Sequence, residues 1–495
     1  FTRLAEHHWD AWLEAYAAFQ RPAYDAAFRA CRALNPGIRY AGYGPGAIYA
    51  SHYKGCEFVK YRPLIPPEHV GFWQYEDYPV ACRYGIERGT YFLTACLMAL
   101  PGARIYPEIY VGGGLGGCPD GAVNYAHPPY GIRGPTSPLT IQRRVYDYAL
   151  ASAHFTGTGF DYWREAGFQS CRFNRGQFEG LLTAWRVVRR HPPARPLRGP
   201  AFVYSEESWK ADSGQTVIQD YGSIVDVRKT VAEDVPMAYE EARRSGLAAG
   251  FLLDMSAVAA LAPNQVDTLV LPPLEGVSKK YRDAIRALHE QGVNLIAFEN
   301  VTGLDDLFGV EDTGAYRRAI HFRTAGSFLR PMAEISNEPK CVGKYRAKDA
   351  AVLVESEIPV LMLNQNRRAS AAFFNVPPTL VNDDRHVRLG YGRESISPIV
   401  RAALAEIFRR FSDAPAAVSA GRLIAYEAQG GETVLVAANP DEDASLSPVV
   451  TVRTSPSARR VAECDKPYTL LSGGGETLRV RLWLGPQEAA VLVLR

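Results

Sequence analysis

The 495-residue sequence lacks any apolar run long enough to cross a membrane, and its formal net charge is only +2. A charge this close to zero provides no strongly basic surface, so we expect neither a membrane nor a nucleic-acid partner. None of its eight cysteines forms a C-x-x-C pair, which excludes the common zinc ribbons and dithiol redox motifs. We therefore expect no metal and no cofactor.

The sequence also lacks a signal-peptide pattern after its first residue, Phe1. Its scattered cysteines fit a reducing compartment or simple burial. These features favour the cytoplasm, but the location is not assigned because the first residue is not Met and the natural N-terminus is not in hand.

What the sequence does contain is one carboxylate in a conspicuous place. The stretch Ala103–Gly117, ARIYPEIYVGGGLGG, predicts a strand over Ala103–Tyr110 followed by a glycine-rich loop. Glu108 lies near the end of that strand, where an acid is costly to bury unless it is paired or used. At the C-terminal end of a β/α-barrel strand, such an acid is typical of a catalytic residue. A loop-end ion pair with Arg104 is the alternative.

Strands alternate with helices around Glu108, which predicts a parallel sheet. A helical region over Trp9–Leu34, with a second segment opening at Pro22, comes first. The expected strands are Ile38–Tyr43, Val70–Tyr75, Ala103–Tyr110 and Thr158–Trp163, and the expected helices are Tyr84–Leu100, Pro138–His154 and Phe178–Arg190. A complete (β/α)8 barrel needs about 250 residues, so this region predicts either half of a TIM-type barrel or a small open sheet.

Two further domains follow. The proline- and arginine-rich stretch His191–Gly199 predicts a linker. An α/β pattern then predicts an open, doubly wound, flavodoxin-like domain, and from about Pro415 short alternating strands predict a small β-sandwich. The predicted domains are residues 1–192, 199–413 and 416–495.

The glycine-rich loop is not a dinucleotide-binding motif. Gly112, Gly114 and Gly117 satisfy G-x-G-x-x-G after a strand, but that motif has to open a helix. Here the turn-forming stretch Cys118–Gly121 follows. A loop over a cleft is the better interpretation.

This order of domains resembles the family-42 glycoside hydrolases, the β-galactosidase group. The stretch Val266–Asn300, VDTLVLPPLEGVSKKYRDAIRALHEQGVNLIAFEN, is similar to that family's trimerisation domain, which is related to glutamine amidotransferases. The phrase Leu484–Leu494, LGPQEAAVLVL, is similar to its last sandwich strand. The resemblance implies an oligosaccharide substrate and a homo-oligomer, a trimer or a dimer. No cysteine follows Thr268–Leu271, so we expect no amidotransferase nucleophile there.

The N-terminal motifs assign roles by the same resemblance. The segment Glu76–Pro79 is similar to the acidic segment after the family's sixth barrel strand. The segment Phe160–Arg164 is similar to the family's eighth barrel strand. Glu108 matches the position of the family's nucleophile, at the end of the seventh barrel strand. In this family the acid/base glutamate lies at the end of the fourth barrel strand. By this alignment the fourth strand lies outside the sequence. The chain therefore resembles a family member that lacks the N-terminal half of the barrel, or one in which that half is supplied otherwise.

We therefore predict a retaining glycosidase that cleaves terminal β-galactosides or related β-glycosides, with Glu108 as nucleophile. Glu76 and Asp77 are expected to bind sugar hydroxyls or orient Glu108, with Glu76 also a candidate replacement acid. The other predicted substrate-binding residues are Trp73, Trp163, Arg164, Tyr125 and His127. Core packing is the alternative for both tryptophans, and a plain ion pair with Glu165 is the alternative for Arg164. A catalytically silent carbohydrate-binding or assembly protein on the same scaffold is the alternative function.

Overall fold

The computed structural model describes residues 9–44, 70–76, 105–110, 139, 142, 146, 163–164, 175–211, 218–220, 223–225, 231–248, 251–319, 321–325, 328, 335–336, 342–376, 379–381, 394–396, 398–441, 443–453, 460–472 and 476–495. Its contacts divide the chain into two units. Unit 1 comprises Phe1–Arg195, Ser213–Lys229 and Arg385–Tyr391, and unit 2 comprises Pro196–Asp212, Thr230–Asp384 and Gly392–Arg495.

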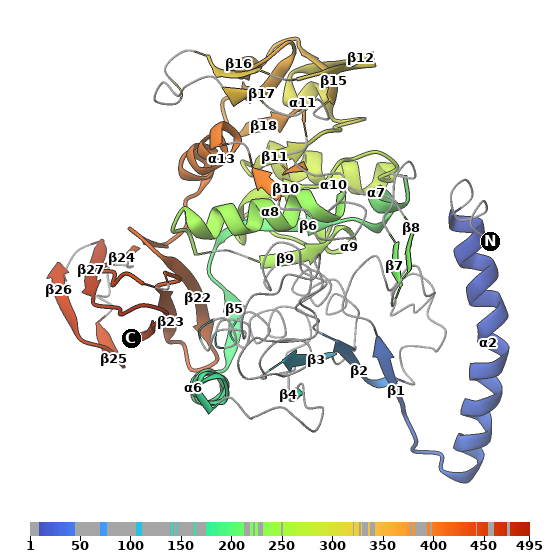
Figure 1. Ribbon diagram of the computed structural model, residues 1–495, viewed down its shortest axis with the longest axis vertical. Coiled ribbons are helices and arrows are strands. Elements are labelled where there is room, and N and C mark those ends of the chain that lie inside the picture. The colour runs from blue at the N-terminus through green and yellow to red at the C-terminus, as the bar shows by residue number, and fades with distance from the viewer. Residues whose placement is uncertain are drawn as a thin grey trace. The chain divides into compact units, whose positions relative to one another are not determined.

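Unit 1 contains a four-stranded parallel sheet in chain order, as the alternating pattern predicts. Its strands are β1 (Tyr40–Gly44), β2 (Val70–Glu76), β3 (Ile105–Tyr110) and β4 (Trp163–Arg164) (Figure 1). Parallel neighbours need a crossover connection, which fits the long sequence intervals between them. The described strands of this sheet do not close into a barrel.

The first helix differs from its prediction. Helix α2 (Trp9–Leu34) is continuous over 26 residues and keeps Pro22 inside it, so the division into two segments is wrong. Proline removes one backbone donor and disfavours a helix interior. Alanine and other strong helix formers on both sides favour one helix through that defect.

The remaining elements of unit 1 are short, except for one helix. Helix α6 (Arg175–Arg190) confirms the predicted closing helix, and β7 (Ile218–Asp220) pairs with β8 (Ser223–Val225). The predicted linker contains a strand, β5 (Pro193–Pro196), in which the chain passes from unit 1 to unit 2. The predicted helix Tyr84–Leu100 lies outside the described residues.

Unit 2 is built on a nine-stranded mixed sheet. Five parallel strands lie in the order β9-β6-β10-β11-β18, which by chain order is 2-1-3-4-5, the order of flavodoxin-type sheets. Their bounds are β6 (Gly199–Tyr204), β9 (Phe251–Asp254), β10 (Val266–Leu271), β11 (Asn294–Phe298) and β18 (Ser370–Phe374). Every residue of β6 and β10 is buried, as expected where helices cover both faces of a parallel sheet.

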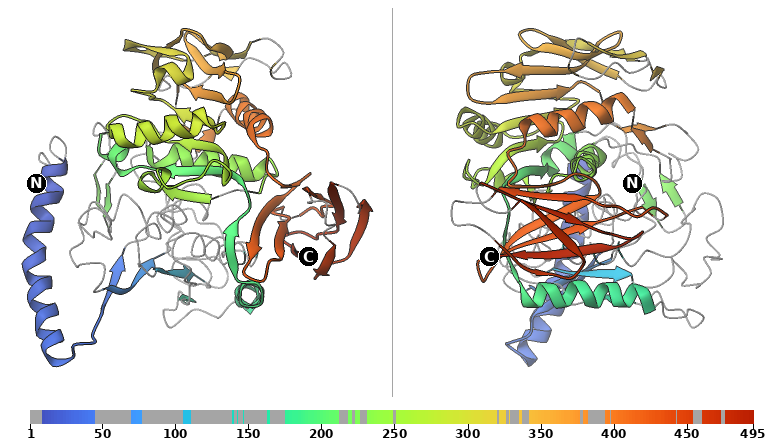
Figure 2. Two further views of the ribbon diagram at one scale, coloured as in Figure 1. Left: turned by 180° about the vertical axis from the view of Figure 1, so that it is seen from behind. Right: turned by 90° about the vertical axis from the view of Figure 1, so that its left-hand side faces the viewer.

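Helices cover the two faces of this sheet (Figure 2). Helix α8 (Val231–Arg244) packs against α13 (Pro398–Phe411), and α9 (Met255–Val258) packs against α10 (Lys279–Glu290). Phe202 of β6 lies between the first pair, with ring centroids 5.2 Å from Tyr239 and 6.0 Å from Phe408. Two short helices, α7 (Glu206–Ala211) and α11 (Asp305–Phe308), complete the described set.

The parallel strands are extended by antiparallel ones that the sequence pattern predicts only in part. Strands β17 (Pro359–Gln365), β16 (Ala351–Glu355), β13 (His321–Thr324) and β14 (Ile335–Ser336) continue the sheet beyond β18. Strands β12 (Val310–Arg318) and β15 (Val342–Ala347) form a separate antiparallel ribbon, and β19 (Thr379–Val381) pairs with β20 (Glu394–Ile396).

The end of the chain folds as two antiparallel sheets around a common apolar core, as predicted. One sheet has the order β21-β24-β27-β26, and the other contains β25-β28-β23-β22. The bounds are β21 (Ala416–Val418), β22 (Arg422–Ala428), β23 (Thr433–Ala438), β24 (Val449–Arg453), β25 (Val461–Cys464), β26 (Tyr468–Ser472), β27 (Thr477–Leu482) and β28 (Ala489–Leu494). Side chains alternate along β27, with Leu478, Val480 and Leu482 in the core.

None of the helices that the structure describes has both the length and the apolar character needed to span a bilayer.

Candidate functional site

The sequence-predicted site lies at the carboxyl ends of the parallel strands in unit 1. Strand β2 ends at Glu76, and its register partner on β3 is Glu108. Adjacent strands are about 4.8 Å apart. Two glutamates that are far apart in the sequence therefore occupy neighbouring positions at one sheet edge.

Strand β4 brings two more predicted residues to the same edge. Trp163 pairs with Ile109, and Arg164 pairs with Tyr110. Pro107 has no backbone N–H to donate to a neighbouring strand. The pairing of β3 with β4 begins two residues later, at Ile109.

Trp73 lies further from this edge. It is the register partner of Ile105, the first residue of β3, and stands three residues before Glu76 on the same strand. Three residues of strand correspond to about 10 Å. Asp77, Tyr125 and His127 lie outside the described residues.

A second polar site, which the sequence interpretation missed, lies at the carboxyl ends of β10 and β11 in unit 2. Glu299 follows β11 directly and has a positive backbone angle, φ 57°. The Asn300 N–H donates to the carbonyl of Phe298 at 2.6 Å, which closes a tight three-residue turn around Glu299. Non-glycine residues rarely adopt this conformation, and such strain clusters at functional sites.

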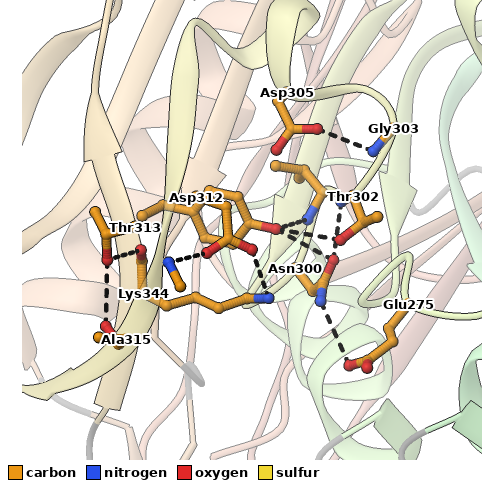
Figure 3. Close-up of polar contacts among 12 residues, drawn as sticks. Glu275, Asn300, Thr302, Gly303, Asp305, Asp312, Thr313, Ala315 and Lys344 are labelled. Carbon is orange, nitrogen blue, oxygen red and sulfur yellow. Dashed lines mark hydrogen bonds and ion pairs between the residues drawn. The ribbon is translucent and has the colours of Figure 1, made fainter.

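Asn300 holds this turn against the neighbouring strands (Figure 3). Its side chain is buried and donates from Nδ2 to Glu275 at 3.4 Å. Its Oδ1 accepts hydrogen bonds from the Thr302 N–H at 2.8 Å and from the Tyr345 hydroxyl at 3.3 Å. The Tyr345 hydroxyl in turn accepts from the Val301 N–H at 3.3 Å. Burial raises the pKa of Tyr345, so this hydroxyl remains a donor at neutral pH.

The ribbon of β12 and β15 supplies the charges beside this network. The Lys344 ammonium lies 2.7 Å from the Asp312 carboxylate. Burial alone would raise the pKa of Asp312, but hydrogen bonds from Lys344 and from the Gly314 N–H hold it below its usual range. The same ribbon lines a pocket of about 460 Å³ in which Glu311 pairs with Arg346 at 2.7 Å. Each ion pair is neutral, and the other charged lining residues, Arg317 and Glu357, also have opposite signs, so the pocket shows no net preference for a ligand of either charge.

The turn at Glu299 bears on the expectation that the middle domain has no thiol nucleophile. That expectation came from the absence of a cysteine after Thr268–Leu271, the segment that forms β10. In the structure, the tight turn with a positive φ follows the next strand, β11. A glutamate stands at that turn, so this position supplies a carboxylate and not a thiol. Among the described residues, no three His, Cys, Asp or Glu side chains are placed to hold a metal ion.

No protein-family model matches the sequence, and no curated protein matches it. Solved structures do match. Gan42B, a GH42 β-galactosidase, has a TM-score of 0.57 at 12% identity over 97% of this chain and 67% of its own. The α-L-fucosidase isoenzyme 2 of Paenibacillus thiaminolyticus has a TM-score of 0.55 at 12% identity over 94% of this chain and 69% of its own.

The β-galactosidase of Bacillus circulans sp. alkalophilus gives the same picture, with a TM-score of 0.54 at 11% identity over 97% of this chain and 66% of its own. The chain thus spans about two thirds of the length of these enzymes. At this identity the likeness concerns the fold alone. The chain has a glycosidase-like, mixed α/β fold similar to that of GH42 β-galactosidases.

Proposed function

We propose that this chain is the larger part of a retaining β-glycosidase that acts on terminal β-galactosides or related oligosaccharides. The observation that carries the proposal is the register of Glu76 and Glu108 at the carboxyl edge of a parallel sheet. The fold likeness to β-galactosidases supports it. In this proposal, β1 to β4 are the C-terminal half of a (β/α)8 barrel, whose active site lies at the carboxyl ends of its strands.

Glu108 is the nucleophile in this proposal. Its carboxylate attacks the anomeric carbon, the bond to the leaving oxygen breaks, and a second carboxyl group gives that oxygen its proton. Water then attacks the glycosyl-enzyme, and the second carboxylate takes the proton from the water. Retaining enzymes hold the two carboxyl groups about 5–5.5 Å apart. The acid/base glutamate is proposed to belong to a segment that is not in this sequence. Glu76, on the strand next to Glu108 and about 4.8 Å away, is the candidate replacement acid.

The remaining predicted residues act on the sugar rather than on the reacting bond. Arg164 and Trp163 lie at the strand end next to Glu108 and are proposed to position the substrate. An arginine donates several hydrogen bonds to hydroxyls, and an indole ring packs on the apolar face of a sugar. Asp77, Tyr125 and His127 keep their proposed substrate-binding roles, and the enzyme is proposed to be a homo-oligomer.

The test is turnover of 4-nitrophenyl β-galactoside by the full-length protein, its Glu108→Gln variant and a matched control, Glu311→Gln. Glu311 is an exposed acid of unit 2 whose partner is Arg346. We expect wild-type and control activity, and a loss of at least about 10³-fold in kcat for Glu108→Gln. Unchanged turnover in Glu108→Gln would remove the nucleophile. Saturable galactoside binding without turnover in the wild type would favour the silent binding protein.

A further inference from the structure

Strand β27 carries two arginines, Arg479 and Arg481, on the outer face of the C-terminal sandwich. Burial alternates along this strand, and both arginines are exposed while the residues on either side of them lie in the core. The strand lies between β24 and β26, so a neighbouring strand flanks the pair on each side. Residues two apart on a strand are about 6–7 Å apart, so the two guanidinium groups project side by side.

Trp483 extends this pair by one more step along the same face. It follows β27 directly and is 46% exposed. The bridge between Leu446 and Leu484 continues the antiparallel register of β24 and β27 past the end of the strand, so the alternation of faces also continues. Arg479, Arg481 and Trp483 therefore form one exposed row, which we call the arginine–tryptophan row.

The two arginines of this row are not neutralised by the side chains that the structure describes around them. Arg453, a third outward-facing arginine on β24, forms an ion pair with Asp413. No described carboxylate forms such a pair with Arg479 or Arg481. Their four register partners on the neighbouring strands are uncharged: Thr451, Ser472, Val449 and Thr469.

An anion would relieve the repulsion within this pair. Two like charges about 6–7 Å apart lie within the Debye length of about 8 Å at physiological ionic strength, so they still repel each other. A guanidinium group binds a carboxylate through two parallel hydrogen bonds. The row therefore offers a surface that is complementary in charge to a ligand with carboxylates along its length.

The tryptophan makes an acidic carbohydrate the best fit among such ligands. An exposed indole ring packs on the apolar face of a sugar ring. The row extends over about 13 Å of strand, so neighbouring units of one glycan chain can contact different residues of it. A nucleic acid fits less well, because its recognition uses a broad basic surface and this chain has a net charge of only +2.

We propose that the arginine–tryptophan row binds a polysaccharide that contains uronic acid units. Carboxylates of the polysaccharide pair with the guanidinium groups of Arg479 and Arg481, and a sugar ring packs on the indole of Trp483. The need for an anion follows from the charges of this face. The choice of a carbohydrate as that anion rests in part on the proposed function.

The test is native affinity electrophoresis of the full-length protein in gels that contain polygalacturonate, neutral galactan or no polymer. We expect only polygalacturonate to retard the protein. We expect the dissociation constant to rise at least about tenfold in Arg479→Gln and in Arg481→Gln, and about fivefold in Trp483→Ala. Arg367→Gln is the matched control, because it removes the same charge from an exposed residue between β17 and β18.

The circular dichroism melting curve of each variant shows whether it is folded. A wild type that polygalacturonate does not retard at low ionic strength would overturn the proposal, as would equal retardation of the folded arginine variants. Wild-type binding by Trp483→Ala, or equally tight binding of duplex DNA, would show a general anion site and overturn the choice of a carbohydrate. A dimer that Arg481→Gln dissociates would assign this face to a second copy instead.

These outcomes are separate from those that test the proposed function. The measured quantity is binding to polygalacturonate, whereas the proposed function is tested by turnover of 4-nitrophenyl β-galactoside. A protein that binds the polymer without hydrolysing the galactoside, or the reverse, would therefore show which of the two proposals fails.

Discussion

Glu76 of β2 and Glu108 of β3 are register partners on adjacent parallel strands. They lie 32 positions apart in the sequence, on adjacent strands, whose usual spacing is about 4.8 Å. A carboxylate beside a carboxylate disfavours the ionised form of one of them. A pair of this kind lets one group act as a base or nucleophile while the other still holds a proton.

The first prediction concerns that pair. We expect Glu76→Gln to abolish the basic limb of the kcat/KM profile, because that limb reports the loss of the proton from the group that acts as the acid. We also expect kcat to fall by about 10²–10⁴-fold on substrates with poor leaving groups, because proton donation is lost.

Substrates with good leaving groups separate the two effects. A dinitrophenyl β-galactoside needs little proton donation, so its bond-cleavage step is expected to lose much less rate in Glu76→Gln. A basic limb that stays in place, with an equal loss on both substrates, would contradict a role as the second carboxyl group.

The second prediction concerns the stability of unit 2 in acid. His289 is buried, its Nδ1 lies 2.9 Å from the carbonyl oxygen of Val293, and its Nε2 lies 3.0 Å from Nδ2 of Asn366. Both contacts are satisfied by a neutral ring that donates from Nδ1 and accepts at Nε2. Burial lowers the pKa of His289 below its ordinary value of 6.5.

The sign of the effect follows from that direction. Above pH 6.5 the ring is neutral in both the folded and the unfolded chain, so its contribution to stability is fully present. As the pH falls below 6.5 the unfolded chain binds the proton first, and the free energy of unfolding decreases until the pH reaches the lowered folded pKa. Urea unfolding between pH 8 and pH 4 measures this loss. An equally steep decrease in His289→Gln would show that other groups cause it.

The third prediction concerns the strained turn after β11. A non-glycine residue in the left-handed region costs about 1–2 kcal/mol, whereas glycine elsewhere costs about 0.5–1 kcal/mol relative to alanine. At Glu299, with φ 57°, we expect this order to reverse, so that Glu299→Gly is more stable than Glu299→Ala by about 0.5–1 kcal/mol. Both variants lack the carboxylate, so their difference isolates the backbone.

Chemical denaturation of the two variants gives the comparison. If Glu299→Ala is the more stable, the turn is not strained. If both variants are far less stable than the wild type, the carboxylate itself holds the turn in place.

The sequence pattern predicts the strands best where burial is complete. The apolar strands β6 and β10 are recognised because helices cover both faces, so each strand forms a continuous apolar run. The ribbon strand β12 is missed for the opposite reason. Eight of its nine residues are exposed, and it contains a glycine at φ 73°, so it shows no alternating pattern.

The sites are predicted less completely, for two physical reasons. The register that aligns Glu76 with Glu108 depends on the lengths and packing of the segments between β2 and β3, which no local pattern encodes. The turn at Glu299 is hidden because glutamate is not a residue that favours positive φ.

The central claim is that the carboxylate of Glu108 forms a covalent bond to the sugar. The most direct measurement is peptide mass spectrometry of the full-length protein after incubation with a 2-deoxy-2-fluoro-β-galactoside that carries a dinitrophenyl leaving group. Fluorine at C2 slows hydrolysis of the glycosyl-enzyme more than its formation, so the labelled species accumulates. The account predicts one fluorogalactosyl group on the peptide that contains Glu108, attached to that residue. Stoichiometric label on a different carboxylate, with Glu108 unmodified, would contradict it.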